Sequence, residues 1–493
     1  MAIVLAIDAG TTGVRTVAID DQGHPGAFSY REFPQHFPRP GWVEHDADDI
    51  WRAVHATLAD VVAQVDAVDI AAIGITNQRE TVVAWDRATG RPLHRALVWQ
   101  DRRTADRCAA LRDAGAEPLV RARTGLVLDP YFSATKLEWL FTHGGITPTA
   151  DLAVGTVDAW ILWNLTGGTD GGVHATEASN ASRTLLFDID ALAWSEELCA
   201  LFGVPSSCLP AVQPSSGRFG TTRPAAAAGL SVPVSGIAGD QQAALFGQAC
   251  FEPGMAKNTY GTGSFVLVNA GTTRPPAVDG VLTTVAWTRA DTVTYALEGS
   301  IFVTGAAIQW LRDGLGLLDA ASDAGPLAAS VADTGGVVFV PALTGLGAPW
   351  WDPYARGAIV GITRGTTRAH LVRATVEAMA WQTADVVDAI SASGQGVSEL
   401  RVDGGAAAMD VLCQFQADVL GVTVRRPSVL ESTALGAAFL AGLAEGVWDS
   451  PADAASAWHA AATFAPAPLP DRDARQAEWH RGVERSRDWA RDD

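Results

Sequence analysis

Three glycine-bearing turns restrict the fold of this chain more than any other feature of its sequence. The first, residues 10–13, joins two strand-like segments at 3–8 and 14–20. The second is the Gly-Thr-Gly run at 261–263, and the third is the Asp-Gly-Gly run at 403–405. Such turns are common, but their backbone N–H groups are free of bulky neighbours, as a polyphosphate requires. Three of them in one chain favour phosphate binding more strongly than any one alone.

The segments around these turns indicate the fold class. A helical pattern at 46–65 follows the first hairpin and precedes a buried strand at 70–76. Near the other end, a short strand at 400–402 leads through the third turn to a helical pattern at 406–420. Strands that alternate with helices favour an α/β fold. Because an acidic strand end followed by glycine occurs near each terminus, we expect duplicated domains, with a boundary within 244–254.

Composition excludes several classes of partner. Of the 493 residues, 48% are hydrophobic and 18% charged, which is typical of a soluble globular protein. The net charge is −20 without any basic block, so neither nucleic acid nor an anionic membrane is an expected partner. The longest apolar run, 434–444, is too short to span a bilayer, and the N-terminus lacks the basic region of a signal peptide. We therefore expect a cytoplasmic protein without membrane insertion.

The five cysteines are scattered and form no CxxC pair. This pattern favours reduced thiols, and it gives no indication of a disulfide framework or a structural zinc site.

Two aspartates occupy positions suited to phosphate chemistry. Asp8 ends the first strand, where a carboxylate can hold Mg²⁺ directly or through water. Asp240 follows the apolar segment 234–238 and should emerge in a cleft between the domains. An alcohol is a poor nucleophile, so a carboxylate is needed to orient it and accept its proton. The alternative for both residues is an ordinary turn aspartate, because Asp near Gly is common in turns.

In these turns and in several longer stretches, the sequence resembles the FGGY carbohydrate kinases of the actin-like superfamily. Within that family it is most similar to members that phosphorylate glycerol. The matching stretches are 41–46, 73–81, 98–103, 129–133, 179–184, 236–248, 345–349 and 351–357. The resemblance implies two actin-like, ribonuclease H-like domains, 1–248 and 249–493, with an interdomain catalytic cleft. It also implies ATP and Mg²⁺ as cofactors, glycerol as substrate, and a homodimer or homotetramer.

The resemblance also assigns a polyol site. Arg79 and Glu80 follow the strand at 70–76, and we place them at its exposed end, where charged pairs are usually solvated. A donor beside an acceptor nevertheless suits hydroxyl groups, which both give and take hydrogen bonds. In the relatives the matching pair binds glycerol, Asp240 is the general base, and Asp8 with Asp240 serves the metal. The other matching substrate positions are Trp99, Tyr131, Gln241 and Phe265.

Nucleotide contacts are implied in both domains, because the first two turns hold phosphate in the family and the third holds adenosine. The matching positions are Thr11, Thr12, Gly13, Arg15, Thr262, Gly305, Gln309, Gly405 and Met409. The chain departs from its relatives at Ala9 and Gly13, which replace Gln and Ser, and at Met409, which replaces Asn. Gly13 loses a hydroxyl, and a thioether cannot replace an amide hydrogen bond. We therefore expect altered ATP affinity with activity retained.

Two alternative functions stay open. In the first, the chain is a kinase for another polyol or sugar, such as erythritol, xylulose or gluconate. In the second, it is a non-catalytic ATP-binding scaffold. The pair Arg79-Glu80 with Trp99 and Tyr131 favours glycerol, and an intact Asp240 argues against the scaffold.

Some relatives are inhibited by fructose 1,6-bisphosphate, and others are activated by phosphorylation of a loop histidine. The matching stretch here, 223–229, has neither the glycine-rich pattern nor a histidine. We therefore expect neither form of control.

Overall fold

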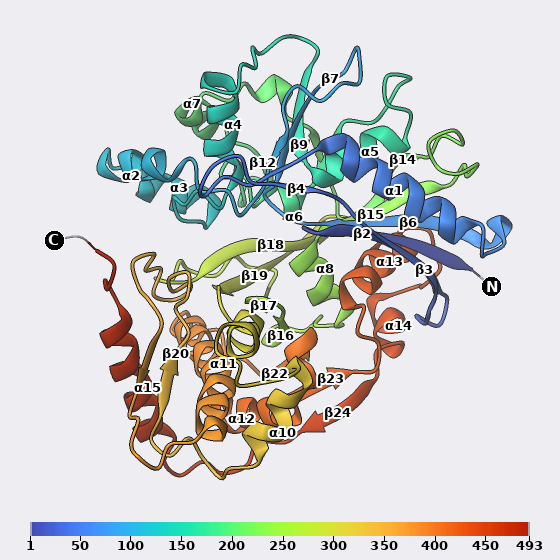
Figure 1. Cartoon of the computed structure of the whole chain (residues 1–493). Coiled ribbons are helices and arrows are strands. Elements are labelled where there is room, and N and C mark those ends of the chain that lie inside the picture. Colours follow the sequence, from blue (N-terminus) through green and yellow to red (C-terminus); the bar gives the residue numbers. More distant parts are fainter. Residues whose placement is uncertain (1, 492–493) are drawn as a thin grey trace.

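The computed structural model describes residues 2–491, and a sheet of 13 strands runs through both halves of the chain (Figure 1). The first half contributes, from the edge inward, β3 (Pro25–Glu32), β2 (Gly13–Asp20), β1 (Ile3–Ala9), β6 (Ile70–Asn77), β15 (Pro233–Gly239) and β14 (Ser216–Thr221). The second half continues with β18 (Leu282–Arg289), β19 (Thr292–Ile301), β17 (Ser264–Gly271), β16 (Met255–Tyr260), β22 (Glu399–Asp403), β23 (Thr423–Pro427) and β24 (Ala460–Phe464). The halves join where Ser216 of β14 pairs with Arg289 of β18.

The two halves repeat one strand arrangement. In the first, β1 pairs antiparallel with β2 and parallel with β6, and β6 pairs parallel with β15. In the second, β16 pairs antiparallel with β17 and parallel with β22, and β22 pairs parallel with β23. The predicted α/β class is confirmed, and this repeat is what a duplicated domain requires.

The predicted helices are present, with different ends. The pattern at 46–65 forms α1 (Ala47–Val62), which begins after Asp46 because that carboxylate accepts a hydrogen bond from the Asp48 N–H. The pattern at 406–420 is interrupted, which corrects the prediction of one continuous helix. A 3₁₀ turn (Gly405–Ala408) is followed by α12 (Asp410–Leu420), because Met409 between them has an extended backbone with ψ of 103°.

Two helices connect the halves of the molecule (Figure 1). α8 (Asp240–Gly247) follows β15 directly, and α13 (Ser432–Ala444) packs against it and against β1, β6 and β15. A Cβ on Gly247 would lie 1.9 Å from the Ser432 carbonyl oxygen, and a Cβ on Gly436 would lie 1.8 Å from that of Ala243. Only glycine permits such an approach of two backbones. The helix that starts with Asp240 is therefore tied closely to the C-terminal part of the chain.

Within residues 2–491, no helix is long and apolar enough to cross a membrane. All five cysteines are buried and unpaired.

Candidate active site

A buried cluster of four charged side chains forms the centre of the site. Arg79 and Glu80 follow β6, Arg183 follows α6 (Ala178–Ala181), and Glu298 lies on β19. The two carboxylate oxygens of Glu298 accept hydrogen bonds from both Nη atoms of Arg79, at 2.6 and 2.9 Å. Arg183 donates from Nη2 to Glu298 at 3.1 Å and from Nε to Glu80 at 2.7 Å. The cluster therefore joins segments from both halves of the chain.

The predicted exposure of Arg79 and Glu80 is wrong, because only 2% and 1% of these residues is accessible to solvent. Buried charges need partners, and here two arginines balance two glutamates. The partner Glu298 lies 219 residues beyond Arg79 in the sequence, so no local pattern could reveal it. One indication was available: Glu298 is a single carboxylate near the middle of an otherwise uncharged strand.

Burial and neighbouring charges oppose each other in this cluster. Burial alone would raise the pKa of Glu298, but Arg183 and Arg79 outweigh it and lower the pKa to about 2. Burial prevails at Glu80, whose pKa is raised although Arg79 and Arg183 act in the opposite direction. Glu298 is therefore the firmly ionised carboxylate that anchors both arginines.

Asp240, the predicted general base, lies at the edge of this cluster. It is the first residue of α8, and its side chain is 29% exposed. Its Oδ1 accepts a hydrogen bond from the Gln241 N–H at 2.7 Å and lies 3.3 Å from Nε of Arg79. Burial raises the pKa of Asp240, while Arg79 and Lys257 oppose that change. A carboxylate with a raised pKa is a better proton acceptor than an ordinary aspartate.

Three predicted aromatic residues surround the same space. The ring centroid of Trp99 lies 5.6 Å from that of Tyr131 and 6.4 Å from that of Phe265. Arg79 Nη2 donates to the Tyr131 hydroxyl at 3.3 Å, and the Arg79 guanidinium lies 5.8 Å from the Phe265 ring centre. Trp99 Nε1 donates to Thr11 Oγ1 at 2.9 Å, which links this wall to the first turn. The structure thus brings the predicted polyol residues together.

The remaining predicted substrate residue, Gln241, faces a lysine. Lys257 donates from Nζ to Gln241 Oε1, and to Thr259 Oγ1 at 3.0 Å. The chain has only two lysines, Lys136 and Lys257, and both are fully buried. Burial lowers the pKa of each to about 8. Sequence reasoning gave Lys257 no role, yet its charge acts on Asp240.

The second and third turns lie against each other. A Cβ on Gly404 would lie 2.5 Å from the Tyr260 carbonyl oxygen. The second turn also rests on the start of α9 (Gly305–Gln309), because the Gly305 N–H donates to Gly261 and the Ala306 N–H donates to Thr262, each at 3.0 Å. Met409 is half-buried, whereas Gly405, Thr262 and Gln309 are exposed.

The predicted nucleotide residues of the first half occupy the β1–β2 turn and the start of β2. Thr11 is half-buried, Thr12 is exposed and Gly13 is buried. Arg15 donates from Nη1 to Glu431 Oε1 at 2.9 Å. Glu431 is the residue directly before α13.

Asp8 and Asp240 provide a donor set that fits Mg²⁺. The pKa of Asp8 is raised to about 7, first by burial and then by the negative charge of Asp240. A divalent cation between them would relieve that repulsion. Mg²⁺ typically uses one or two carboxylates together with water and substrate phosphates. Consistent with such a sparse protein contribution, no group of three or more metal-ligating His, Cys, Asp or Glu residues occurs in the described part of the chain.

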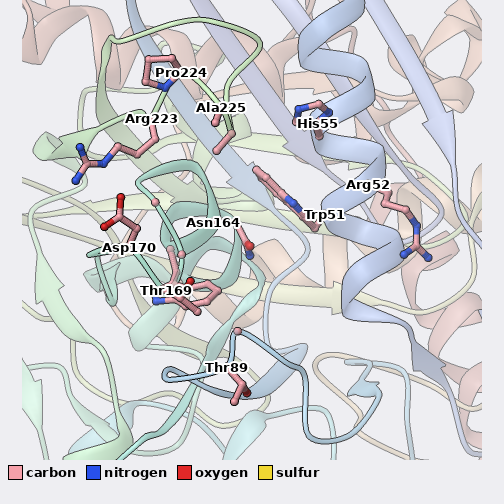
Figure 2. Close-up of a pocket in the computed structure, with 15 residues that line it drawn as sticks. Trp51, Arg52, His55, Thr89, Asn164, Thr169, Asp170, Arg223, Pro224 and Ala225 are labelled. Carbon is pink, nitrogen blue, oxygen red and sulfur yellow. The ribbon is translucent and has the colours of Figure 1, made fainter.

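A separate hollow of about 940 Å³ is lined by other residues (Figure 2). α1 contributes Trp51, Arg52 and His55, α5 (Val157–Leu165) contributes Asn164, and residues 223–226 form another side. None of the predicted substrate or nucleotide residues lines it. Its importance is that it includes the start of the stretch 223–229.

The chain matches the FGGY family of carbohydrate kinases, its N-terminal domain at residues 3–247 and its C-terminal domain at residues 256–445. It is 55% identical to a glycerol kinase of Dechloromonas aromatica, covering 99% of this chain and 98% of that one. It is 54% identical to a glycerol kinase of Halorhodospira halophila, covering 99% and 97%.

Among solved structures, the Plasmodium falciparum glycerol kinase with ADP superposes with a TM-score of 0.92 at 34% identity, covering 99% of this chain and 98% of that one. A xylulose kinase from Lactobacillus acidophilus gives a TM-score of 0.87 at 21% identity, covering 99% and 97%, a likeness that concerns the fold alone.

Proposed function

Because the chain belongs to the FGGY family of carbohydrate kinases, we propose that it transfers the terminal phosphate of ATP to glycerol, giving glycerol 3-phosphate and ADP. The observation that carries this proposal is the position of Asp240, 3.3 Å from Arg79 beside the wall of Trp99, Tyr131 and Phe265. Full-length relatives more than 50% identical to the chain are glycerol kinases, which supports glycerol over other polyols.

Asp240 orients the reacting hydroxyl and accepts its proton. Arg79 binds a second hydroxyl, and its fixed position follows from the short bonds to Glu298. The contacts that glycerol can replace are the longer ones, from Arg79 Nη2 to Tyr131 and from Nε to Asp240, each 3.3 Å. The aromatic wall packs against the carbon backbone of the substrate and excludes water from the reacting atoms.

The nucleotide side uses the three turns. The turn at 10–13 holds phosphate from one domain, 261–263 holds it from the other, and the segment around Gly405 receives adenosine. Asp8 and Asp240 would hold Mg²⁺, which when bound neutralises charge on the phosphates. Because the phosphoryl transition state is loose, positioning and charge neutralisation should matter more than the strength of the base.

The test is a comparison of substrates. Initial rates with ATP are measured for glycerol, erythritol, xylulose and gluconate by coupling ADP release to NADH oxidation. We expect the highest kcat/KM for glycerol. A much higher value for another substrate would refute glycerol, and no turnover of any of them would favour the scaffold.

We also propose that the boundary between the domains lies between residues 248 and 249. The protein should form a homodimer or homotetramer and be located in the cytoplasm. Light scattering of the purified chain tests the assembly state, since a mass of 51.6 kDa would correspond to a monomer.

Fructose 1,6-bisphosphate at millimolar concentration should leave the rate unchanged. The hollow in Figure 2 contains Arg52 and Arg223, but Asp49 is paired with Arg52, and the Asp170 carboxylate also lines the hollow. Two phosphate groups would need more positive charge than this. Initial rates at 0–5 mM effector check the expectation, with Arg223→Ala as the matched variant. Strong inhibition that Arg223→Ala abolishes would contradict it.

Met409→Asn should lower the KM for ATP about fivefold, because it adds an amide hydrogen bond worth about 1 kcal/mol. Met409 is also the N-cap of α12 and makes no side-chain capping bond. Asparagine is a good N-cap, so the free energy of unfolding should rise by about 0.5–1 kcal/mol. Met409→Ser separates the two effects, because serine caps the helix but is too short to reach the nucleotide. An unchanged KM for ATP in Met409→Asn would show that position 409 makes no nucleotide contact.

A further inference from the structure

A row of side chains crosses three neighbouring strands beside the first turn. Asp8 of β1 pairs with Arg15 of β2, and Arg15 pairs with Tyr30 of β3. Residues directly opposite each other in antiparallel strands project from the same face of the sheet. Tyr30 therefore projects from the face that carries the residues proposed for metal and phosphate.

The neighbours of Tyr30 confirm this direction. Ser29 Oγ and Arg31 Nη2 both donate to Asp60, which lies on α1, at 2.7 Å. Successive side chains of a strand alternate between its two faces. Since Ser29 and Arg31 face α1, Tyr30 faces away from α1 and towards the site.

Tyr30 reaches the turn because position 13 has no side chain. A Cβ on Gly13 would lie 2.7 Å from the Tyr30 hydroxyl and 2.6 Å from the Arg31 carbonyl oxygen. The Tyr30 hydroxyl lies 3.5 Å from Thr12 Oγ1, and its ring centre lies 5.8 Å from the Arg15 guanidinium. Tyr30 is 41% exposed, so part of this residue remains accessible to a ligand on this face.

We propose that Tyr30 is a further nucleotide-binding residue, whose hydroxyl donates a hydrogen bond to a phosphate oxygen of ATP held at residues 10–13. The inference rests on the proposed function. Gly13 offers no hydroxyl of its own, and the glycine is what admits the phenol of Tyr30 to the same place. Position 30 requires a long side chain such as that of tyrosine, because β3 is the third strand of the row. A shorter side chain would not extend past Gly13 to the turn.

Tyr30→Phe removes the hydroxyl alone and tests the contact. We expect the KM for ATP to rise about tenfold, since a hydrogen bond to a charged group contributes about that factor. The KM for glycerol should stay within about twofold of wild type. Tyr354→Phe is the matched control, because Tyr354 is also exposed, at 46%, and lies outside the site. An ATP KM equal to that of wild type would overturn the contact, whereas a wild-type protein without turnover would refute the proposed function instead.

A second pair of variants separates direct contact from an effect through Thr12. Thr12→Val removes the neighbouring hydroxyl, and the double variant removes both. The Kd for ATP is measured by calorimetry in the absence of glycerol. If Tyr30 binds phosphate itself, Tyr30→Phe raises this Kd by the same factor with and without Thr12→Val. If Tyr30→Phe has no effect in the Thr12→Val protein, Tyr30 only orients Thr12 and the proposal fails.

Discussion

Asp240→Asn lowers kcat by about 10³-fold, within the range that a positioned general base contributes. The side chain keeps its shape, but an amide cannot accept the proton of the reacting hydroxyl. Folding should persist, because Arg79 remains bound to Glu298 through both Nη atoms. Glycerol should still bind, because Arg79 and the aromatic wall are unchanged.

Steady-state rates and calorimetric titration with glycerol check both parts of this expectation. Asp313→Asn is the control, because Asp313 is 63% exposed and pairs with the adjacent Arg312. Turnover within tenfold of wild type in Asp240→Asn would show that another group accepts the proton.

Glu298→Gln should reduce the free energy of unfolding by about 3–5 kcal/mol, because it leaves two buried arginines short of a counter-charge. Activity should fall as well, because Arg79 loses its anchor and with it the geometry for glycerol. Glu197→Gln provides the comparison: Glu197 pairs with Arg123 at 3.4 Å, and both side chains are about half exposed. Removing that surface pair should cost less than about 1 kcal/mol. Urea unfolding measures both values, and similar losses in the two variants would refute the structural role of the cluster.

The lowered pKa of Glu298 should make the stability of the protein sensitive to acid. This pKa is about 2 in the folded protein, against an ordinary value of 4.5. A group with a lowered pKa stabilises the fold fully above its unfolded pKa, and that stabilisation is lost as pH falls through the folded value. Wild type should therefore lose stability between pH 4.5 and 2 more steeply than Glu298→Gln. Equal slopes in this range would mean that Glu298 is not the responsible group.

The sequence predicted those parts of the site that lie at the ends of recognisable strands. Asp8, Arg79 and Asp240 each follow an apolar segment, and the structure places all three beside strand ends that meet in the sheet. Their roles came from the matching positions of the FGGY family, because the residues alone also fit ordinary turns and solvated loops.

The partners across the chain could not be predicted in this way. The role of Arg183 and Glu298 can be recognised only once folding has brought them close to Arg79. Their burial also runs against the usual preference of charged side chains for solvent. Met409 was assigned to a helix because the apolar pattern continued through it, but capping of α12 requires an extended residue there. Tyr30 had no predicted role, because its relation to Gly13 depends on the register of β2 and β3.

The burial of both lysines has a practical consequence for chemical labelling. With Lys136 and Lys257 fully enclosed, every cationic side chain on the protein surface is an arginine or a histidine. Amine-reactive dyes and cross-linkers should therefore leave the side chains of the native protein unmodified. Lys257 lies beside Asp240, and its pKa of about 8 keeps part of it as the nucleophilic free amine. Modification of Lys257 without Lys136 would thus report the loss of its contact with Gln241, and ATP with glycerol should slow it.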